Sequence, residues 1–477
     1  MSLQGRQVAF LTPKNDRLPS LHIYVFLSIP FLLAALSWFS FPILANWLST
    51  NLFGYMPLYE PAGWLWYTAV ILYYSWFTFL AIGVGGLLAV GAWLSQRWAK
   101  RKQMDFYPMV SFVVPAFNEE KHLPKCIDSL FKCGERYPGL VEIIIVDDGS
   151  GDNSYEIAFA SINLNKRRSP GIKGRVIRHT ANLGKAEALR SGCNRALGQV
   201  VAVVDADSWW REDTLQNLIE YMSANGKVAV TGYVHPSDSS SEGNPYAVLQ
   251  QLEYSQGLGV FRCAQALGNS VLVVPGAIGL YEANILRNIL NNKTMKSVTE
   301  DFEITLDLQK QGYEVGYMNA ARCGTTVPES FSSFWGQRSR WFVGWLHNTL
   351  QIHRGILLSR RWISLLLWYC LIVEYAGAFV ELAAITSFPF LFWFAPDRIL
   401  FVLNLLWFGF YTLTIGMVSQ LIALRFAYGK HTSRSLLCYT PFYAILRFIN
   451  LWIRGVSVVR YALGYRGNWE RKRIRTA

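Results

Sequence analysis

The sequence predicts an α/β fold, with a doubly wound sheet, placed between membrane-spanning helices. From about residue 106 to 328, short apolar runs rich in β-branched residues alternate with amphipathic stretches, as in a sheet covered by helices on both faces. Long apolar runs lie on both sides of this region. Hydrophobic residues make up 52% of the 477 residues, which is more than a soluble protein usually carries.

The charge and the cysteine content indicate which partners and which kinds of site to expect. The formal net charge is +13, and the basic residues cluster beside the apolar runs, as on the cytoplasmic face of a membrane protein. No nucleic-acid-binding motif accompanies them, so we expect a lipid bilayer, and no nucleic acid, as a partner. The seven cysteines are odd in number and form no Cys-x-x-Cys pair, which argues against disulfides and zinc.

Two apolar runs at the N-terminus, 22–48 and 64–94, are each long enough to cross a bilayer. The connection 49–63 contains no Lys or Arg, whereas four basic residues follow the second run between 97 and 102. Because Lys and Arg favour the cytoplasmic side, we expect the N-terminus and the chain after about Ser95 to lie in the cytoplasm. The first run is too long for a signal peptide and lacks a small-residue cleavage site.

The central region begins with apolar runs that predict buried strands of a doubly wound sheet. The expected strands are 110–114, 141–146, 175–178, 200–204, 228–234 and 314–318. Helices are expected after Asn118, from about 182 to 197, from 212 to 223, and from Phe302 onward. Asn118 is placed to cap the first of these helices, with two glutamates in its first turn. The Ser-rich stretch 236–244 is expected to be a loop.

Polar residues follow several of these strands. In an open α/β sheet, ligands bind beyond the carboxyl ends of the strands, so a site is expected there. The run 200–204 ends in Asp205 and Asp207, separated by one residue. Paired carboxylates at a strand end suit a hard divalent cation that also contacts phosphates. A solvated turn carrying two acids is the alternative interpretation of Asp205 and Asp207.

The chain after the sheet region begins with an aromatic and basic amphipathic segment, 331–358, that we expect to lie in the membrane interface. A core helix is the alternative. Two further apolar runs, 362–384 and 399–423, are predicted spans, and the loop 386–397 between them lacks Lys and Arg.

The run 436–463 contains three arginines and allows two interpretations. It is either an interfacial or re-entrant helix, or a span whose arginines line a polar conduit, since arginine in lipid is costly. We expect four spans plus interfacial helices. Glu374 and Glu381, seven residues apart, are expected to face the interior of the bundle.

The predicted organisation has four parts. Residues 1–102 form the cytoplasmic N-terminus and two spans, 103–328 a cytoplasmic catalytic domain, 329–360 amphipathic interfacial helices, and 361–477 C-terminal helices that form a channel.

Six motifs in a fixed order resemble those of the membrane-embedded, processive family 2 glycosyltransferases, which include synthases of poly-N-acetylglucosamine, hyaluronan, chitin and cellulose. The resemblance covers about 106–345 by motif and the flanking helices by layout. The motifs are Val-Pro-Ala-Phe-Asn-Glu-Glu at 114–120, Asp-Asp-Gly-Ser at 147–150, Asn-Leu-Gly-Lys-Ala at 182–186, Asp-Ala-Asp at 205–207, Thr-Glu-Asp at 299–301 and Gln-Arg-Ser-Arg-Trp at 337–341.

The resemblance implies a GT-A fold and a role for each motif. The residues it implies for nucleotide-sugar binding are Ala116, Asn118, Glu119, Asp147, Asp148, Lys185, Asp205, Gln337 and Arg340. It implies Asp205 and Asp207 as ligands of Mg²⁺ or Mn²⁺, with Asp207 the direct ligand. Asp301 would be the catalytic base, with a helix N-cap as the alternative. Trp341 would stack on the acceptor sugar, with an aromatic-belt residue as the alternative.

The function implied is that of a multi-pass enzyme of the cell (plasma or inner) membrane: an inverting, processive hexosyltransferase that uses a UDP-sugar to elongate a growing glycan and move it across the bilayer. The region from Val298 to Trp341 is closest in pattern to poly-N-acetylglucosamine synthases, which favours UDP-GlcNAc. Alternatives are a hyaluronan synthase that also uses UDP-GlcA, a lipid glucosyltransferase that makes a single addition, and a non-enzymatic membrane subunit. The sequence does not indicate whether an accessory membrane subunit binds the protein. A dinucleotide-dependent oxidoreductase is disfavoured, because no Gly-x-Gly-x-x-Gly follows the first strand.

Overall fold

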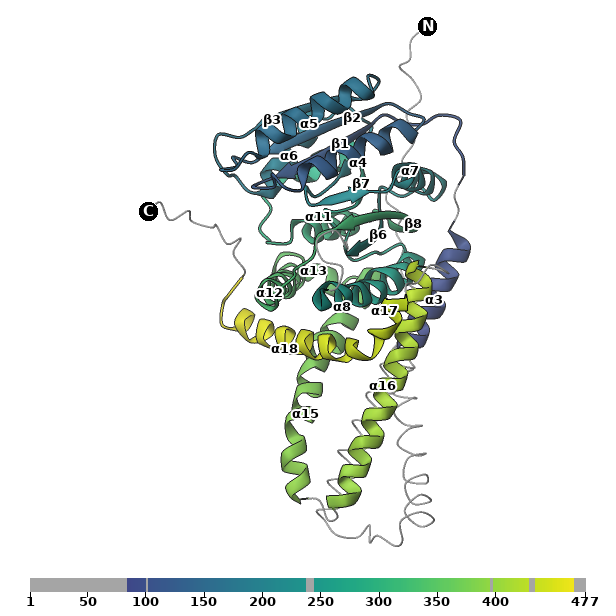
Figure 1. Ribbon diagram of the computed structural model, residues 1–477, viewed down its shortest axis with the longest axis vertical. Helices are drawn as coiled ribbons and strands as arrows, with labels where there is room; N and C mark the ends of the chain where they lie inside the picture. The colour runs from purple at the N-terminus through teal and green to yellow at the C-terminus, as the bar shows by residue number, and fades with distance from the viewer. Residues whose placement is uncertain (1–83, 100–101, 237–243, 395–397, 429–433, 467–477) are drawn as a thin grey trace.

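The computed structural model describes residues 84–99, 102–236, 244–394, 398–428 and 434–466 (Figure 1). Several predicted segments lie outside the described residues: the first span 22–48, the second span up to residue 83, and residues 237–243 of the Ser-rich loop. The second span ends in helix α3 (Gly85–Trp98).

An eight-stranded sheet forms the centre of the catalytic region, in the order β3-β2-β1-β4-β7-β6-β8-β5. The strands are β1 (Val110–Ala116), β2 (Val141–Asp147), β3 (Lys173–Arg178), β4 (Val200–Val203), β5 (Ser208–Trp210), β6 (Ala229–Pro236), β7 (Gly279–Glu282) and β8 (Val315–Thr325). Strands β3, β2, β1 and β4 run parallel, in the register Ala116 opposite Asp147 and Val203 opposite Val113. The six predicted strands are therefore present, although β8 extends well beyond its predicted end.

The sheet is mixed, a feature that the prediction of a doubly wound sheet did not specify. Strand β7 runs antiparallel to both of its neighbours, β4 and β6, and β5 runs antiparallel to β8. Both strands were missed because neither is a continuous run of β-branched residues: β5 is Ser-Trp-Trp and β7 is Gly-Leu-Tyr-Glu. Strand β4 is as short as β7 but was predicted, because its four residues, Val-Val-Ala-Val, are all apolar.

Helices cover both faces of the sheet, and this explains why every residue of β1 and β2 is buried. One face packs against α4 (Leu123–Arg136), α5 (Ser154–Arg168) and α7 (Thr214–Ala224). The other packs against α6 (Lys185–Arg195), α10 (Ala283–Asn292) and α11 (Glu300–Lys310). Along β1 the side chains alternate between the two cores, with Phe112 and Val114 on one face and Val113 on the other.

The helices that follow the sheet form the lower half of the molecule in Figure 1. They are α12 (Phe331–His347), a π-helical turn at Asn348–Ile352, α13 (Arg354–Leu357), α14 (Trp362–Tyr369), a π-helical stretch at Cys370–Ala376, α15 (Gly377–Phe394), α16 (Arg398–Tyr428), α17 (Arg434–Cys438) and α18 (Tyr443–Ala462). Helix α8 (Pro245–Tyr254) and the π-helical and α-helical turns that follow it up to Gln265 precede these helices in the sequence but pack among them. Helix α8 and the π-helical turn contact α16, and Glu253 on α8 pairs with Arg338 on α12.

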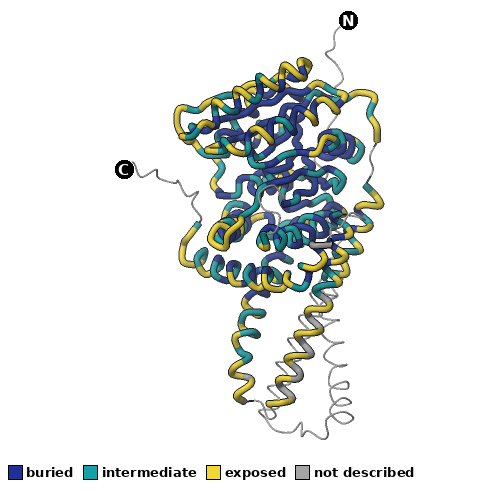
Figure 2. The backbone as a smooth tube through the Cα atoms, in the orientation of Figure 1, coloured by how far each residue is buried: buried dark blue, intermediate teal, exposed yellow. Residues whose placement is uncertain are grey.

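Two segments among the described residues are long and apolar enough to cross a membrane, Trp362–Phe390 and Thr440–Ala462. Helix α15 continues as far as Phe394, so residues 386–394 of the predicted loop 386–397 are helical. Helices α15 and α16 run side by side away from the catalytic region, and many of their side chains are exposed (Figure 2). The exposed ones include the large apolar side chains of Phe390, Trp393, Ile399, Leu406 and Phe410.

Helix α18 crosses the base of the catalytic region, roughly perpendicular to α15 and α16 (Figure 1). One of its faces packs against α12, whereas the side chains of Phe442, Ile445, Phe448 and Trp452 are exposed. Helix α12 therefore lies between the sheet and α18. It buries Phe334 and Val343 and exposes Phe331 and Trp341, so the interfacial helix and the core helix both stay predictions.

Two ion pairs join α18 to the preceding helices. Arg447 Nη2 lies 2.9 Å from both carboxylate oxygens of Glu381, and Arg454 Nη1 lies 2.6 Å from Glu374 Oε2. The two glutamates and the two arginines have the same seven-residue spacing, so one antiparallel approach of the helices forms both pairs. The glutamates do turn inward, as their spacing predicted, and the arginines supply their counter-charges.

Candidate active site

The loops after β1 and β2 are tied to each other by side chains. Asn118 N–H donates to Ser150 Oγ at 3.0 Å, Asn118 Oδ1 accepts from Gly151 N–H at 2.9 Å, and Glu119 N–H donates to Ser154 Oγ at 2.7 Å. Ala116 stands opposite Asp147, so both loops begin at the same edge of the sheet. The predicted nucleotide loops are therefore brought together.

Asn118 does not cap a helix, which corrects that part of the prediction. The first helix begins five residues later, at Leu123, and Asn118 has a left-handed backbone with φ 57°. Asparagine tolerates this conformation better than most residues because its short polar side chain can bond locally. Its bond to the β2 loop satisfies the side chain in the way a cap would have done.

Asp147 and Asp148 are both buried but have different partners. Asp147 Oδ1 accepts from Ser150 N–H at 3.2 Å, and its Oδ2 lies 3.3 Å from Arg178 Nε. Asp148 accepts from Leu183 N–H at 3.0 Å and from Gly184 N–H at 2.7 Å, and lies 2.7 Å from His179 Nδ1.

Asp148 thus shapes the loop that leads into Lys185, a use of this carboxylate that sequence reasoning missed. Gly184 has φ +96°, a conformation that side chains rarely adopt, so its position in this turn requires glycine. His179 was missed entirely. The only sequence signal for it was its place just after the third strand, at the same edge as the other loops.

Lys185 lies between two carboxylates. Its Nζ is 2.7 Å from Asp205 Oδ1 and 2.9 Å from Glu300 Oε1, so it joins the loop after β4 to the first turn of α11. The two acids raise the pKa of Lys185 well above its usual value against the opposing effect of burial. A Cβ on Gly276 would come within 2.5 Å of Asp205 Oδ1 and 2.7 Å of Lys185 Nζ, so glycine leaves the space this ion pair fills.

Asp207 accepts hydrogen bonds from two hydroxyl groups. Its Oδ1 accepts from Ser208 Oγ at 3.1 Å and its Oδ2 from Thr326 Oγ1 at 3.3 Å. Burial and then the charge of Asp205 raise the pKa of Asp207. Two neighbouring carboxylates that both offer hard oxygen ligands fit a divalent cation between them.

Asp301 lies in the first turn of α11, after the N-cap position Thr299, so it is not the cap itself. Its Oδ1 accepts from Phe302 N–H at 2.8 Å. Burial, followed by the charge of Glu300, raises the pKa of Asp301 to about 6, while Lys185 acts in the opposite direction. The carboxyl group is therefore poised to exchange a proton near neutral pH.

Helix α12 packs directly on the segment that carries Asp301. Asn348 Nδ2, just after α12, donates to Thr299 Oγ1 at 3.0 Å, and the rings of Phe302 and Trp345 stack with centroids 6.0 Å apart. Gln337 and Arg340 are partly buried on this helix, and the Trp341 side chain is 37% exposed. The C-terminal end of α12 and the residue after it thus contact the segment that carries Asp301. The five residues of the motif at 337–341 lie earlier on the same helix and differ widely in exposure.

A second group of possible metal ligands lies on the far part of α11, but it already contains a cation. Glu303, Asp307 and His353 bring their ligand atoms within 4.8 Å of one another. Lys293 Nζ is 2.8 Å from both carboxylates. This ammonium group balances their charge, and none of the predicted metal ligands belongs to the group.

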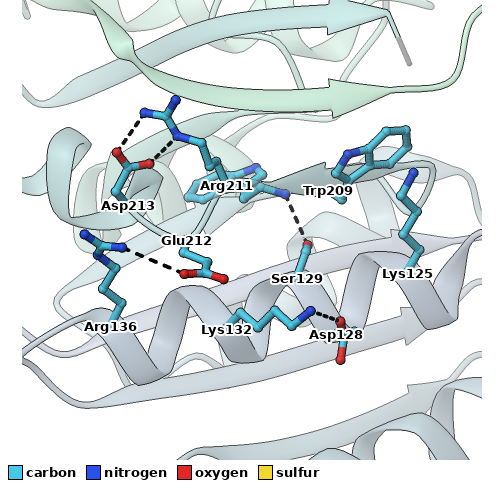
Figure 3. Close-up of a pocket in the computed structure, with 10 residues that line it drawn as sticks. Lys125, Asp128, Ser129, Lys132, Arg136, Trp209, Arg211, Glu212 and Asp213 are labelled. Atoms are coloured by element: carbon cyan, nitrogen blue, oxygen red, sulfur yellow. Dashed lines mark hydrogen bonds and ion pairs between the residues drawn. The ribbon is translucent and has the colours of Figure 1, made fainter. Parts of the chain in front are cut away.

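A groove of about 700 Å³ lies between α4 and β5 (Figure 3). Its charged side chains pair largely with each other: Lys132 with Asp128 at 2.8 Å and Arg211 with Asp213 at 2.5 Å. Lys125 Nζ covers the ring of Trp209 at 3.2 Å. The lining contains none of the predicted site residues, so this groove is separate from the sheet edge described above.

Comparison with known proteins gives the same family as the motifs. Residues 111–290 match the model of Glycosyl transferase family 2. A poly-β-1,6-N-acetyl-D-glucosamine synthase of Staphylococcus epidermidis is 25% identical over 363 residues, which cover 73% of this chain and 82% of that one. The synthase of the same name from Staphylococcus aureus (strain COL) is 27% identical over 279 residues, 56% of this chain and 64% of that one.

Solved structures align at low similarity. A mannosyltransferase from Pyrobaculum calidifontis, in complex with GDP-Man and Mn²⁺, has a TM-score of 0.48 and 16% identity, covering 83% of this chain and 99% of that chain. TarS 1–349 of S. aureus, in complex with UDP, has a TM-score of 0.36 and 14% identity, covering 75% of this chain and 92% of that chain.

The family match covers the first seven strands of the sheet, β1 to β7, together with the loops that carry Asp147, Lys185 and Asp205. The mixed sheet with helices on both faces is that of a GT-A glycosyltransferase fold. The chain therefore carries a family 2 glycosyltransferase domain and is a transferase homologous to the poly-β-1,6-N-acetyl-D-glucosamine synthases.

Proposed function

We propose that the protein is an inverting, processive glycosyltransferase that elongates a polysaccharide from UDP-GlcNAc and passes the growing chain across a membrane. The observation that carries this proposal is the cluster at the sheet edge, where Lys185 joins Asp205 to Glu300 beside the partly buried Asp301. That cluster offers a cation site, a positive charge and a base within one small region. Homology to synthases of poly-β-1,6-N-acetyl-D-glucosamine supports the donor and the polymer.

The donor side of the reaction needs charge stabilisation as the sugar leaves the diphosphate. Asp205 and Asp207 would hold Mg²⁺ or Mn²⁺, which supplies Lewis-acid stabilisation of the diphosphate. Lys185, Gln337 and Arg340 would add cationic and polar contacts, and an arginine suits phosphate because it can donate two hydrogen bonds in parallel. Ala116, Asn118, Glu119, Asp147 and Asp148 would shape the nucleoside end of the site.

The acceptor side needs a base and a sugar platform. Asp301, ionised, would take the proton from the acceptor hydroxyl as that oxygen attacks the anomeric carbon and the bond to the diphosphate breaks. Direct displacement of this kind inverts the anomeric configuration. The partly exposed ring of Trp341 would stack on the acceptor sugar.

The arrangement of the helices supports a multi-pass protein of the cell membrane with the catalytic domain in the cytoplasm. Helices α15 and α16 would cross the bilayer, since they project from the domain with exposed apolar side chains. Helix α18 would lie in the interface with Phe448 and Trp452 toward lipid, because it runs across the base of the domain. The ion pairs of Arg447 and Arg454 would keep their charges out of lipid.

A donor panel tests the proposed substrate. Purified protein in nanodiscs, with Mn²⁺ or Mg²⁺, is given UDP-GlcNAc, UDP-GlcA, UDP-Glc or UDP-Gal, singly and in pairs, and the release of UDP is measured. We expect sustained turnover with UDP-GlcNAc alone. Turnover that requires UDP-GlcA as well would indicate a hyaluronan synthase, and turnover with UDP-Glc alone would contradict the proposed donor.

A further inference from the structure

One buried charge in the catalytic region is not used by the proposed reaction. The guanidinium group of Arg338, on α12, is 1% exposed and is surrounded by aromatic rings. Its Cζ lies 4.6 Å from the ring centroid of Phe334 and 4.2 Å from that of Trp341. The sequence placed Arg338 inside the Gln-Arg-Ser-Arg-Trp motif but gave it no role.

Arg338 is held by a carboxylate from another helix. Its Nη2 donates to Glu253 Oε2 at 2.5 Å and its Nε to Glu253 Oε1 at 3.3 Å, a two-pronged contact across from α8. Glu253 Oε1 also accepts from Asn450 Nδ2, on α18, at 2.9 Å. One carboxylate therefore ties together the motif helix, α8 and the helix at the base of the domain.

The same guanidinium contacts two side chains to which the proposed function gives substrate roles. Arg338 Nη1 donates to Gln337 Oε1 at 2.5 Å, which fixes the rotamer of that amide, and the plane of Trp341 lies against the cation. Neither Gln337 nor Trp341 is fully buried, so neither is fixed by packing alone. Their orientation depends on where the Arg338 side chain is held.

We propose that Glu253 and Arg338 are positioning residues, which set Gln337 and Trp341 in the geometry that donor and acceptor require. A buried ion pair is costly to desolvate and gives little net stability, so a well-packed apolar pair would serve stability alone at least as well. The pair's contacts with Gln337 and Trp341 give it a role that an apolar pair could not fill. This inference rests on the proposed function for the roles of those two residues.

Removing the charge of Glu253 tests the proposal. In Glu253→Gln the shape is kept, but the cation of Arg338 loses its counter-charge and is expected to move toward water, taking Gln337 with it. We expect the KM for the donor to rise about tenfold or more, with a smaller change in kcat. Glu253→Asp keeps the negative charge but, with one methylene fewer, holds it further from Arg338. The donor KM of this variant should therefore lie between those of the wild-type protein and Glu253→Gln. Donor kinetics and melting temperature are measured for each variant.

Glu314→Gln is the matched control. Glu314, just before β8, pairs with Lys227, just before β6, at 2.6 Å, which makes another largely buried ion pair between elements of the sheet. Both glutamine variants should lower the melting temperature, but the control should keep the wild-type KM. An equal rise in KM in both variants, or an unchanged KM in Glu253→Gln, would show that the Glu253–Arg338 pair is only structural.

A double variant identifies the route. If Glu253 acts through Gln337, the effects of Glu253→Gln and Gln337→Ala on donor KM will not add, and full additivity would overturn the proposal. All comparisons use whichever donor the wild-type protein turns over in the donor panel. The two proposals can therefore fail separately. Use of a donor other than UDP-GlcNAc would overturn the proposed function, but the KM values for that donor would still show whether Glu253 positions Gln337.

Discussion

Asp301→Asn is expected to reduce sugar transfer by at least about 100-fold, because a general base contributes roughly 10²–10⁴ to the rate. Asparagine has nearly the same shape and can still accept from Phe302 N–H, but it cannot take a proton from the acceptor hydroxyl. Binding of UDP, measured by calorimetry with Mn²⁺ present, should therefore survive. Asp307→Asn is the control, since Asp307 lies on the same helix but pairs with Lys293.

The pH dependence of the same step follows from the environment of Asp301. Burial raises the pKa of Asp301 to about 6, and the base works only when ionised. The rate should therefore rise with pH through about 6 and level off above it. Transfer by Asp301→Asn near the wild-type rate, or a wild-type rate that stays flat down to pH 5, would place the base elsewhere.

Asp207→Asn should have the second large effect, on binding of the nucleotide with its cation. The wild-type carboxylate would give a charged oxygen to Mg²⁺ or Mn²⁺, whereas a neutral amide oxygen is a weaker ligand for a hard cation. We expect UDP affinity in the presence of Mn²⁺ to fall at least about tenfold, or ~1.4 kcal/mol. The residual affinity should no longer depend on Mn²⁺.

Calorimetric titration of UDP with and without Mn²⁺ measures this effect. Asp213→Asn is a suitable control, because Asp213 pairs with Arg211 beside the groove between α4 and β5. That control should keep the dependence on Mn²⁺. An unchanged Mn²⁺ dependence in Asp207→Asn would remove Asp207 from the cation site.

The sequence predicted the parts of the fold that carry long local patterns. The strands β1 and β2, buried on both faces, appear as mainly apolar runs with a single polar residue near the start of each, Ser111 and Glu142, so their positions and the loops beyond them could be inferred. The antiparallel strand β7 could not be inferred, because its four residues pair with β4 and β6 through contacts far away in sequence.

In the candidate site, too, single residues could be predicted from local sequence patterns, whereas their contacts could not. Lys185, Asp205 and Asp301 were predicted individually, and the structure brings Lys185 and Asp205 into contact. The contact between Lys185 and Glu300 and the use of Asp148 to hold the turn at Gly184 were not predicted. Both depend on side-chain positions across separate elements, which residue type and spacing along the chain do not report.

The membrane half gives a further case. The seven-residue spacings of Glu374 with Glu381 and of Arg447 with Arg454 were visible, and each predicted that its residues share a helical face. Which glutamate meets which arginine depends on the antiparallel approach of the helices, and so became apparent only in three dimensions.

The size of the product made from UDP-GlcNAc as sole donor tests the central claim most directly. Labelled product from wild-type protein in nanodiscs is separated by organic extraction and gel, then digested with linkage-specific glycosidases, with Asp301→Asn as the blank. We predict a high-mass, water-soluble polymer of N-acetylglucosamine. A small product that enters the organic phase would contradict the account and identify a glycolipid synthase.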